Sequence, residues 1–329
     1  MARGPGEDRI VGVPMFVSLA ESGELERRAA VARESLSACR LCPRECGVDR
    51  LAGEVGYCGA GPTARVYRHM AHPGEEPPIS GTRGSGTIFW SHCTMSCCFC
   101  QNYHMSQLGE GSDRTIEELS GMVSALSGAG CHNINHVSPT QFLPHVLESL
   151  LLAWRAGAAL PVVWNTSGYE SEFALELLDG VVDIYLSDVR YASDDAARKF
   201  SDTPDYVPVS RAALVEMHRQ VGGLQVDADG VASRGLIVRH LVLPNGHAGT
   251  REAMRFVAGE LGVETHVSLM AQYYPACRAR EFPDLARRIT REEWSEALAA
   301  LEEAGLKNGW VQEYQEGLSP IAGTEIASD

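Results

Sequence analysis

The sequence lacks an apolar run that could cross a membrane. The longest early run, Ile10–Ala20, is interrupted by Pro14 and falls short of the roughly 20 apolar residues that a spanning helix needs. Glu7 and Asp8 stand just ahead of this run, where a secretory signal peptide would carry basic residues. We therefore expect a cytoplasmic protein that makes no membrane contact.

Basic side chains are few relative to acidic ones. The chain has 28 Lys and Arg against 43 Asp and Glu, which gives a net charge of −15. Proteins that bind nucleic acid need basic surfaces, so this balance argues against DNA or RNA as the main partner. A length of 329 residues with 44% apolar side chains suits a globular protein of one large domain or two small ones.

The chain contains ten cysteines, and three of them stand close together in one short run. Cys93, Cys97 and Cys100 follow the spacing C-x3-C-x2-C. Thiolates are the usual ligands of iron–sulfur clusters, and a [4Fe–4S] cluster normally takes four of them. Three thiolates leave the fourth iron open to a substrate or cofactor, which indicates chemistry rather than electron storage.

Other interpretations of these cysteines are weaker. A disulfide framework is not expected in a chain of this size without a secretory signal. A structural zinc site would need a fourth ligand, such as His92 or His104, and its cysteine pairs usually have the spacing C-x2-C. Cys98 lies directly beside Cys97, an awkward position for a second ligand, so we predict that it is a buried thiol.

Four further cysteines lie upstream in the order Cys39-x2-Cys42-Pro-x2-Cys46-x11-Cys58. Four soft ligands within 20 residues could surround a zinc ion or hold an auxiliary iron–sulfur cluster. A cysteine-rich loop without metal is the third possibility. The sequence leaves these three open.

Strand-like and helix-like segments alternate after about residue 86. The predicted strands are Thr87–His92, Asn133–Ser138, Pro161–Thr166, Asp183–Val189, Leu236–Leu243 and His266–Tyr273. Apolar residues at helical spacing lie between many of them, as in 116–126 and 146–154. Six such units predict an α/β fold with a parallel sheet, and they fall short of the eight units of a closed barrel. We therefore expect an open, partial barrel.

Polar residues follow the ends of the predicted strands, where parallel barrels collect their reactive groups. They are Cys93, Asn135, Ser138, Asn165, Thr166, Ser187, Asp188, Arg190, His240 and Gln272. Any one of them could be a capping or turn residue. Their recurrence at six strands predicts a site at this edge of the sheet.

Several runs carry a resemblance to a known superfamily. Besides the triplet, they are Glu75–Gly81 (EEPPISG), Cys100–Asn102 (CQN), Val137–Thr140 (VSPT), Asn165–Glu170 (NTSGYE), Arg239–Pro244 (RHLVLP) and Met270–Tyr273 (MAQY). With the upstream cysteines they cover roughly residues 39 to 273. The chain resembles the radical S-adenosylmethionine superfamily, and within it the homologues of pyruvate formate-lyase activating enzyme.

The resemblance implies a partial (β/α)6 TIM-like barrel with an N-terminal cysteine-rich extension. It implies a [4Fe–4S] cluster on Cys93, Cys97 and Cys100, and S-adenosylmethionine cleaved reductively to a 5′-deoxyadenosyl radical. A flavodoxin- or ferredoxin-like donor would supply the electron. The expected division is an extension over 1–80, a core over 81–275 and a C-terminal helical segment over 276–329 that closes the barrel.

The resemblance also nominates residues that contact the cofactor or substrate. They are Asn135, Asn165, Thr166, Asp188 and His240. The Gly-Gly-Glu run that activating enzymes commonly carry at the second strand is absent here. Backbone carbonyls, or the amides of Asn133 and Asn135, are candidates to replace its Glu. No catalytic side chain is assigned.

Three functions remain open from the sequence. The first is activation of a glycyl-radical enzyme by hydrogen abstraction from a glycine of that partner. The second is radical chemistry on a small molecule or peptide of the enzyme's own. The third is a non-catalytic iron–sulfur electron carrier, against which the open iron argues.

Overall fold

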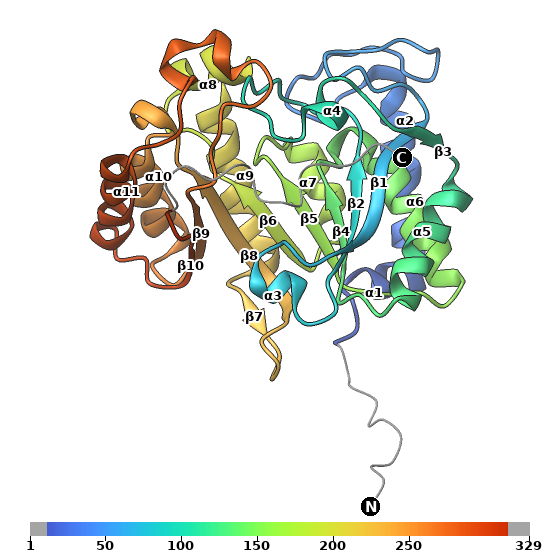
Figure 1. Cartoon of the computed structure of the whole chain (residues 1–329). Coiled ribbons are helices and arrows are strands. Elements are labelled where there is room, and N and C mark those ends of the chain that lie inside the picture. Colours follow the sequence, from blue (N-terminus) through green and yellow to red (C-terminus); the bar gives the residue numbers. More distant parts are fainter. Residues whose placement is uncertain (1–11, 315–329) are drawn as a thin grey trace, which may run out of the picture.

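Ten strands form one open sheet in the order β10-β9-β8-β6-β5-β4-β2-β1-β3, with β7 paired to β8 alone (Figure 1). The structure is a computed structural model that describes residues 12–314. Its strands are β1 Ala64–His72, β2 Ser85–Trp90, β3 Ser112–Arg114, β4 Ile134–Val137, β5 Val162–Thr166, β6 Ile184–Asp188, β7 Gln225–Val226, β8 Ala232–Leu241, β9 His266–Met270 and β10 Gly309–Val311. The open order confirms the predicted α/β fold with an unclosed barrel.

The strands from β2 to β10 are paired in parallel along this order. All six predicted strands are present, each with bounds that shift by a few residues. Two antiparallel strands, β1 and β3, extend the sheet beyond β2 and were not predicted. Since β1 pairs with β2, part of the expected N-terminal extension belongs to the sheet.

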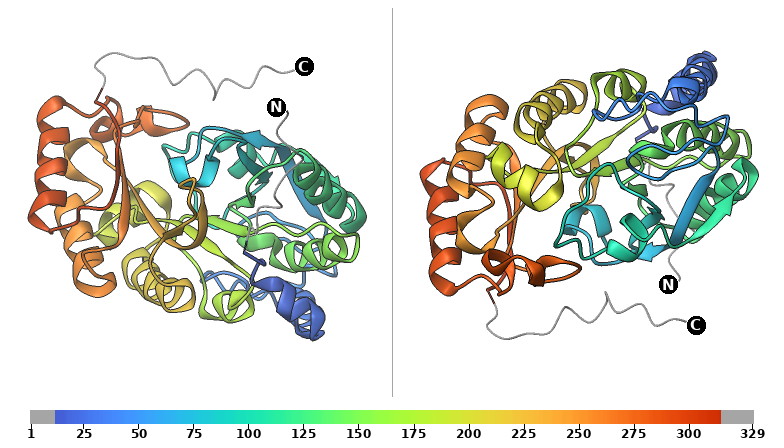
Figure 2. Two further views of the ribbon diagram at one scale, coloured as in Figure 1. Left: turned by 90° about the horizontal axis from the view of Figure 1, so that it is seen from below. Right: turned by 90° about the horizontal axis from the view of Figure 1, so that it is seen from above.

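The helices form an outer layer around the curved sheet, except α3, which packs against its inner face (Figure 2). They are α1 Phe16–Glu21, α2 Glu24–Glu34, α3 Pro77–Ser80, α4 Tyr103–Ser106, α5 Ile116–Gly128, α6 Leu143–Arg155, α7 Glu172–Leu178, α8 Asp194–Ser201, α9 Tyr206–Val221, α10 Thr250–Phe256 and α11 Arg291–Glu303. Capping boxes start α5, from Thr115 with Glu118, and α11, from Thr290 with Glu293. Each satisfies two backbone N–H groups that the first helical turn leaves without partners.

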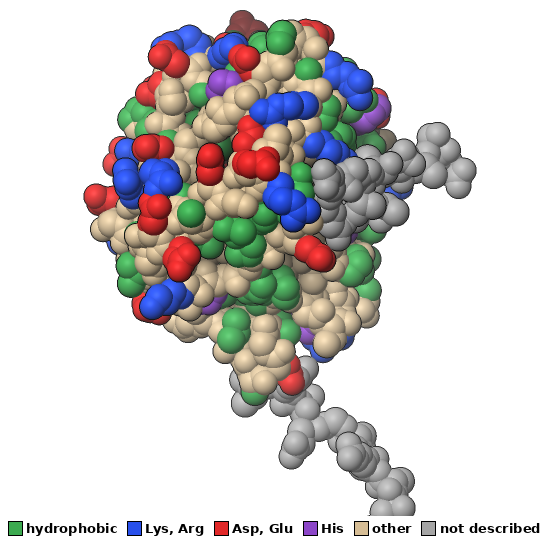
Figure 3. Space-filling model, turned by 60° about the vertical axis from the view of Figure 1, so that its left-hand side comes forward, with side chains coloured by type: hydrophobic (Ala, Val, Ile, Leu, Met, Phe, Trp, Pro, Cys, Tyr) green, Lys and Arg blue, Asp and Glu red, His purple; other side chains and the backbone are tan. Residues whose placement is uncertain are grey.

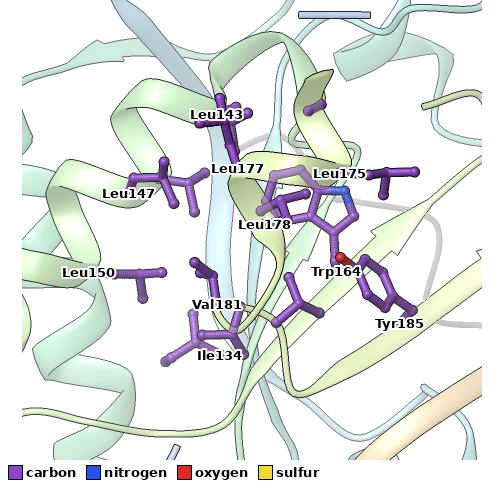
Figure 4. Close-up of a cluster of buried hydrophobic side chains, with 14 of the residues drawn as sticks. Ile134, Leu143, Leu147, Leu150, Trp164, Leu175, Leu177, Leu178, Val181 and Tyr185 are labelled. Carbon is purple, nitrogen blue, oxygen red and sulfur yellow. The ribbon is translucent and has the colours of Figure 1, made fainter. Parts of the chain in front are cut away.

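The main hydrophobic core lies between the sheet and this helical layer. Leu147 and Leu150 of α6 pack there with Trp164 of β5 and Tyr185 of β6, and all four are at most 1% exposed (Figure 4). Burying a large apolar side chain stabilises the fold by about 1.5–3 kcal/mol. Because the outer face of the sheet supplies this core, the inner face can carry polar side chains.

The carboxyl ends of the parallel strands point toward the upper edge in Figure 1, where α4 and α8 also lie. The domain boundaries at residues 80 and 275 stay predictions. Residues 1–11 and 315–329, which belong to the two outer segments of that division, lie outside the described residues.

The surface carries charged side chains of both signs. Acidic and basic side chains are interspersed on the face in Figure 3. No helix between residues 12 and 314 has both the length and the apolar character required to cross a bilayer.

Candidate active site

The cysteine triplet lies on the loop that follows β2. His92 adopts a left-handed backbone conformation with φ 70°, which turns the chain at the end of the strand. Backbone hydrogen bonds then anchor the loop from both sides: His92 N–H donates to Met105 O at 2.7 Å, and Cys98 N–H donates to Phe200 O at 2.7 Å. The loop is therefore fixed by α4 and α8.

The thiols of the triplet are enclosed. Burial, together with the nearby Cys97 sulfur, raises the pKa of Cys93 to about 12 and that of Cys100 to about 11. Met95 N–H lies 3.5 Å from Cys93 Sγ, and the Ser106 hydroxyl lies 3.2 Å from Cys100 Sγ. The thiols of Cys93 and Cys100 therefore stay protonated at neutral pH until a metal displaces their protons.

Cys98 is buried, as predicted, and is 1% exposed. Burial and the neighbouring Cys97 sulfur raise its pKa to about 12. It lies within electrostatic range of Cys277 and Arg278. Its role as a non-ligand stays a prediction.

The donor set fits a cluster better than a single ion. Among residues 12–314, no three or more His, Cys, Asp or Glu side chains are placed to hold one metal ion. Four thiolates around one zinc ion would lie roughly 3.8 Å apart, as follows from Zn–S bonds of about 2.3 Å in a tetrahedron. In a [4Fe–4S] cluster each thiolate binds a different iron, so the sulfurs need not meet at one point.

The interior of the barrel has an apolar floor. Val163, Ile184, Leu186 and Ile237 project from the inner face of β5, β6 and β8, and Ile79 of α3 packs against them. Alternation along each strand places the next inward side chains one level higher. The floor therefore closes the interior on the side away from the cysteine loop.

A charged layer lies above this floor. The guanidinium of Arg239 donates to Asp188 Oδ1 at 2.8 Å and to Asn165 Oδ1 at 2.6 Å, and it lies 3.8 Å from Glu75 Oε2. Burial raises the pKa of Glu75 to about 7, while the charge of Arg239 acts in the opposite direction. These four side chains form a polar network inside the barrel.

Arg190 joins this network to the cysteine loop. Its Nη2 donates to Asp188 Oδ2 at 2.6 Å, and its Nη1 lies 3.7 Å from Cys97 Sγ. Its Nε is buried and has no acceptor within the described part of the chain. A buried donor without a partner is costly, so this atom suits a ligand that brings an acceptor.

The structure brings together three of the five nominated contact residues. Asn135, Asn165 and Asp188 all lie on the inner face of the sheet, because their strand neighbours Ile134, Trp164 and Ser187 point the other way. Asn133, the other candidate near the second strand, is engaged elsewhere: its amide donates to Ile79 O at 2.8 Å.

Thr166 and His240 lie on the opposite face from this network. The Thr166 hydroxyl donates to Glu170 Oε1. The His240 ring lies 2.7 Å from Val189 O and 3.0 Å from Thr250 Oγ1, and burial lowers its pKa to about 4. A contact of either side chain with a ligand inside the barrel is therefore not favoured by the geometry.

Arg239 and Glu75 were missed as site residues by the sequence reasoning, and Arg190 was noted only as a residue at a strand end. Glu75 and Arg239 lie in runs that carry the resemblance, and Arg190 lies at the end of a predicted strand. Arg239 precedes His240 on a strand buried on both faces, and the period of two assigns only one of them to the interior. The buried apolar pattern of this strand does not say which.

The upstream cysteines lie next to the same loop. Arg50, which lies between Cys46 and Cys58, donates to Gln141 O at 2.7 Å, and Gln141 Nε2 donates to the carbonyls of Ser91 and His92 at 2.9 and 3.1 Å. Arg44 Nε donates to Thr94 O at 3.1 Å. The N-terminal segment therefore packs directly against the loop of the triplet.

Comparisons with known proteins give limited similarities. No protein-family model matches the chain. An uncharacterised protein of Methanocaldococcus jannaschii is 29% identical over 294 residues, which cover 86% of this chain and 79% of that protein. Because that relative is uncharacterised, the similarity assigns no activity to this chain.

Two solved structures are similar at low identity. One is HydG, a maturase of the [FeFe]-hydrogenase, with a TM-score of 0.45 and 13% identity over 68% of this chain; the chain spans half the length of that structure. The other is methylornithine synthase, with a TM-score of 0.43 and 14% identity over 90% of this chain and 76% of that one. At this degree of similarity neither structure bears on the activity of the chain.

Proposed function

We propose that the chain is a radical S-adenosylmethionine enzyme with its [4Fe–4S] cluster held by Cys93, Cys97 and Cys100. The observation that carries the proposal is the position of the triplet. Three enclosed thiols of one loop lie beside the charged interior of an open barrel, and Arg190 touches both Cys97 and Asp188. When bound, the cluster would supply the electron that breaks the C5′–S bond of S-adenosylmethionine, with methionine leaving.

The residues of the chain would bind and enclose the reactants. Arg190 and Arg239 offer cationic donors for a carboxylate, Asp188 and Asn165 offer acceptors for hydroxyl groups, and the apolar floor limits the depth of the interior. A primary carbon radical reacts with most C–H bonds nearby. The protein must therefore hold the substrate in contact and exclude water.

Two substrates are candidates for the hydrogen abstraction. The resemblance to activating enzymes supports a glycine of a partner glycyl-radical enzyme. The charged layer in the interior favours instead a small polar molecule or peptide of the enzyme's own. In either case a flavodoxin- or ferredoxin-like protein would donate one electron per cleavage.

Product analysis tests the proposed function. The anaerobically reconstituted, dithionite-reduced protein should slowly release 5′-deoxyadenosine and methionine from S-adenosylmethionine. Radical enzymes of this kind cleave S-adenosylmethionine slowly even when no substrate is present. The Cys97→Ala variant should release none, and the matched Cys98→Ser variant should match the parent. Absence of 5′-deoxyadenosine from fully loaded, reduced protein would leave the electron-carrier function in its place.

A further inference from the structure

The N-terminal segment contains a second group of thiols, formed by Cys39, Cys42, Cys46 and Cys58. The chain folds back on itself here: Cys39 N–H donates to Val48 O at 3.0 Å, and Gly47 N–H donates to Cys39 O at 3.0 Å. Cys46 Sγ consequently lies 4.0 Å from the Cys39 carbonyl. Cys42 is within electrostatic range of the other three sulfurs. All four thiols are thus gathered in one region.

Both cysteine groups share a local hydrogen-bond pattern. In the triplet, Cys93 and Cys100 each accept a hydrogen bond from the backbone N–H two residues further along the chain. In the upstream segment, Cys42 and Cys58 accept the same bond from the same relative position. The two groups therefore present their sulfurs to the backbone in the same way, with an N–H group placed to hydrogen-bond a metal-bound thiolate.

An arginine lies against a sulfur in both groups as well. Arg50 Nη1 is 3.9 Å from Cys39 Sγ, as Arg190 Nη1 is 3.7 Å from Cys97 Sγ. Arg50 is 1% exposed, and its hydrogen bonds among residues 12–314 go to backbone carbonyls and this sulfur, with no carboxylate in ion-pair distance. Buried charges are normally compensated, so Arg50 indicates an anion at this place.

We propose that Cys39, Cys42, Cys46 and Cys58 hold a second iron–sulfur cluster. Four thiolates with iron give the anionic centre that Arg50 requires. A zinc ion would need all four sulfurs to converge on one point. The four thiols do not converge in this way, and neither do those of the triplet. With four protein ligands this cluster has no open iron, so its role is to fix the neighbouring loop and exchange electrons rather than to bind substrate.

The second cluster would lie one layer of side chains from the triplet. Arg50 reaches the loop through Gln141, and Arg44 reaches it directly at Thr94. Loss of the second cluster should therefore loosen the loop that carries Cys93 without removing a ligand of the first.

Iron, sulfide and zinc analysis of the reconstituted full-length chain tests this proposal. The parent should contain about eight irons, as two [4Fe–4S] clusters require. A Cys93→Ala, Cys97→Ala, Cys100→Ala triple variant should retain about half of them with matching sulfide. Cys42→Ser should lose the other half, and the matched Cys131→Ser variant, changed at a buried cysteine of neither group, should lose none.

Cys46 is exposed, so Cys46→Ala separates loss of a ligand from loss of folding if the buried Cys42 variant misfolds. A triple variant without iron, or one with a single zinc that Cys42→Ser removes, would overturn the second cluster. Because the triple variant cannot cleave S-adenosylmethionine, its iron content answers this question independently of the proposed radical activity.

Discussion

The two cysteine groups differ in what lies beneath them. The triplet stands over the charged interior of the barrel, where Arg190 lies 3.7 Å from Cys97 Sγ and is paired with Asp188. The four-cysteine segment instead surrounds Arg50, which donates to the backbone carbonyls of Gly61 and of Gln141 in the turn after β4. In the proposed clusters, three thiolates beside a polar interior would leave one iron free to bind a ligand, whereas four thiolates against backbone would leave none free.

Arg190 and Arg50, the arginines beside the two cysteine groups, differ in the same way. The Arg190 side chain is 26% exposed, and its Nε has no acceptor among the described residues. Arg50 is 1% exposed, and its N–H groups point to the carbonyls of Gly61 and Gln141 and to Cys39 Sγ. The first arginine is placed to meet a ligand, and the second is placed to hold structure.

The largest expected effect separates the two groups in one assay. Cys93→Ala should abolish 5′-deoxyadenosine release, because it removes a ligand of the cluster beside the interior. Cys42→Ser should retain a measurable fraction of that release, because the triplet keeps its three thiolates. Product quantification by chromatography, with the iron content of each variant measured in parallel, checks both. Complete inactivity of Cys42→Ser with an intact triplet cluster would contradict the assigned division of roles.

A second effect concerns the free energy of unfolding. Arg50→Met should lower the free energy of unfolding by on the order of 3–5 kcal/mol. The change leaves buried carbonyl acceptors without a donor and removes the hydrogen bond to Gln141 O. Arg190→Met should cost less, since Asp188 keeps its bond to Arg239. Arg219→Met, at an exposed ion pair, should cost under about 1 kcal/mol. Denaturant unfolding of the three variants tests this ranking, and equal losses would refute it.

A smaller effect tests the junction between the two regions. The Ser171 hydroxyl donates to the carbonyl of Leu41 in the four-cysteine segment, and the preceding Glu170 is buried. Burial raises the pKa of Glu170 to about 7, although hydrogen bonds from Thr166 and Thr140 lower it in part. Its folded-state pKa thus lies above its unfolded one, so the folded protein binds the extra proton between pH 4.5 and 7.

This carboxyl therefore contributes stability at low pH that is lost as the pH rises to about 7. The loss amounts to about 3 kcal/mol from this group. Glu170→Gln should gain stability relative to the parent over this range, while the exposed control Glu21→Gln should follow the parent. Unfolding curves at pH 5, 6, 7 and 8 measure the difference, and parallel curves for parent and Glu170→Gln would exclude the buried proton.

The sequence predicted the parallel strands because they are buried on both faces and read as apolar runs. It missed β1, which is half exposed and contains Arg65, Tyr67, Arg68 and His69, and it missed the three-residue β10. Within the site, the cysteines were identifiable from spacing alone. The spacing did not show on which face of the sheet Thr166 and His240 lie. Each directly follows a polar residue on a strand with no exposed side, so the sequence does not tell which of the two points inward.

The most direct test of the central claim is hyperfine spectroscopy of the reduced cluster with S-adenosylmethionine labelled with 15N and 17O in its methionyl group. If Cys93, Cys97 and Cys100 leave one iron open, the labelled amino nitrogen and carboxylate oxygen should show strong hyperfine coupling to the cluster. The same coupling should persist in Cys42→Ser and be absent in Cys97→Ala. A reduced, fully loaded cluster without any coupling to the labelled methionyl group would contradict the account.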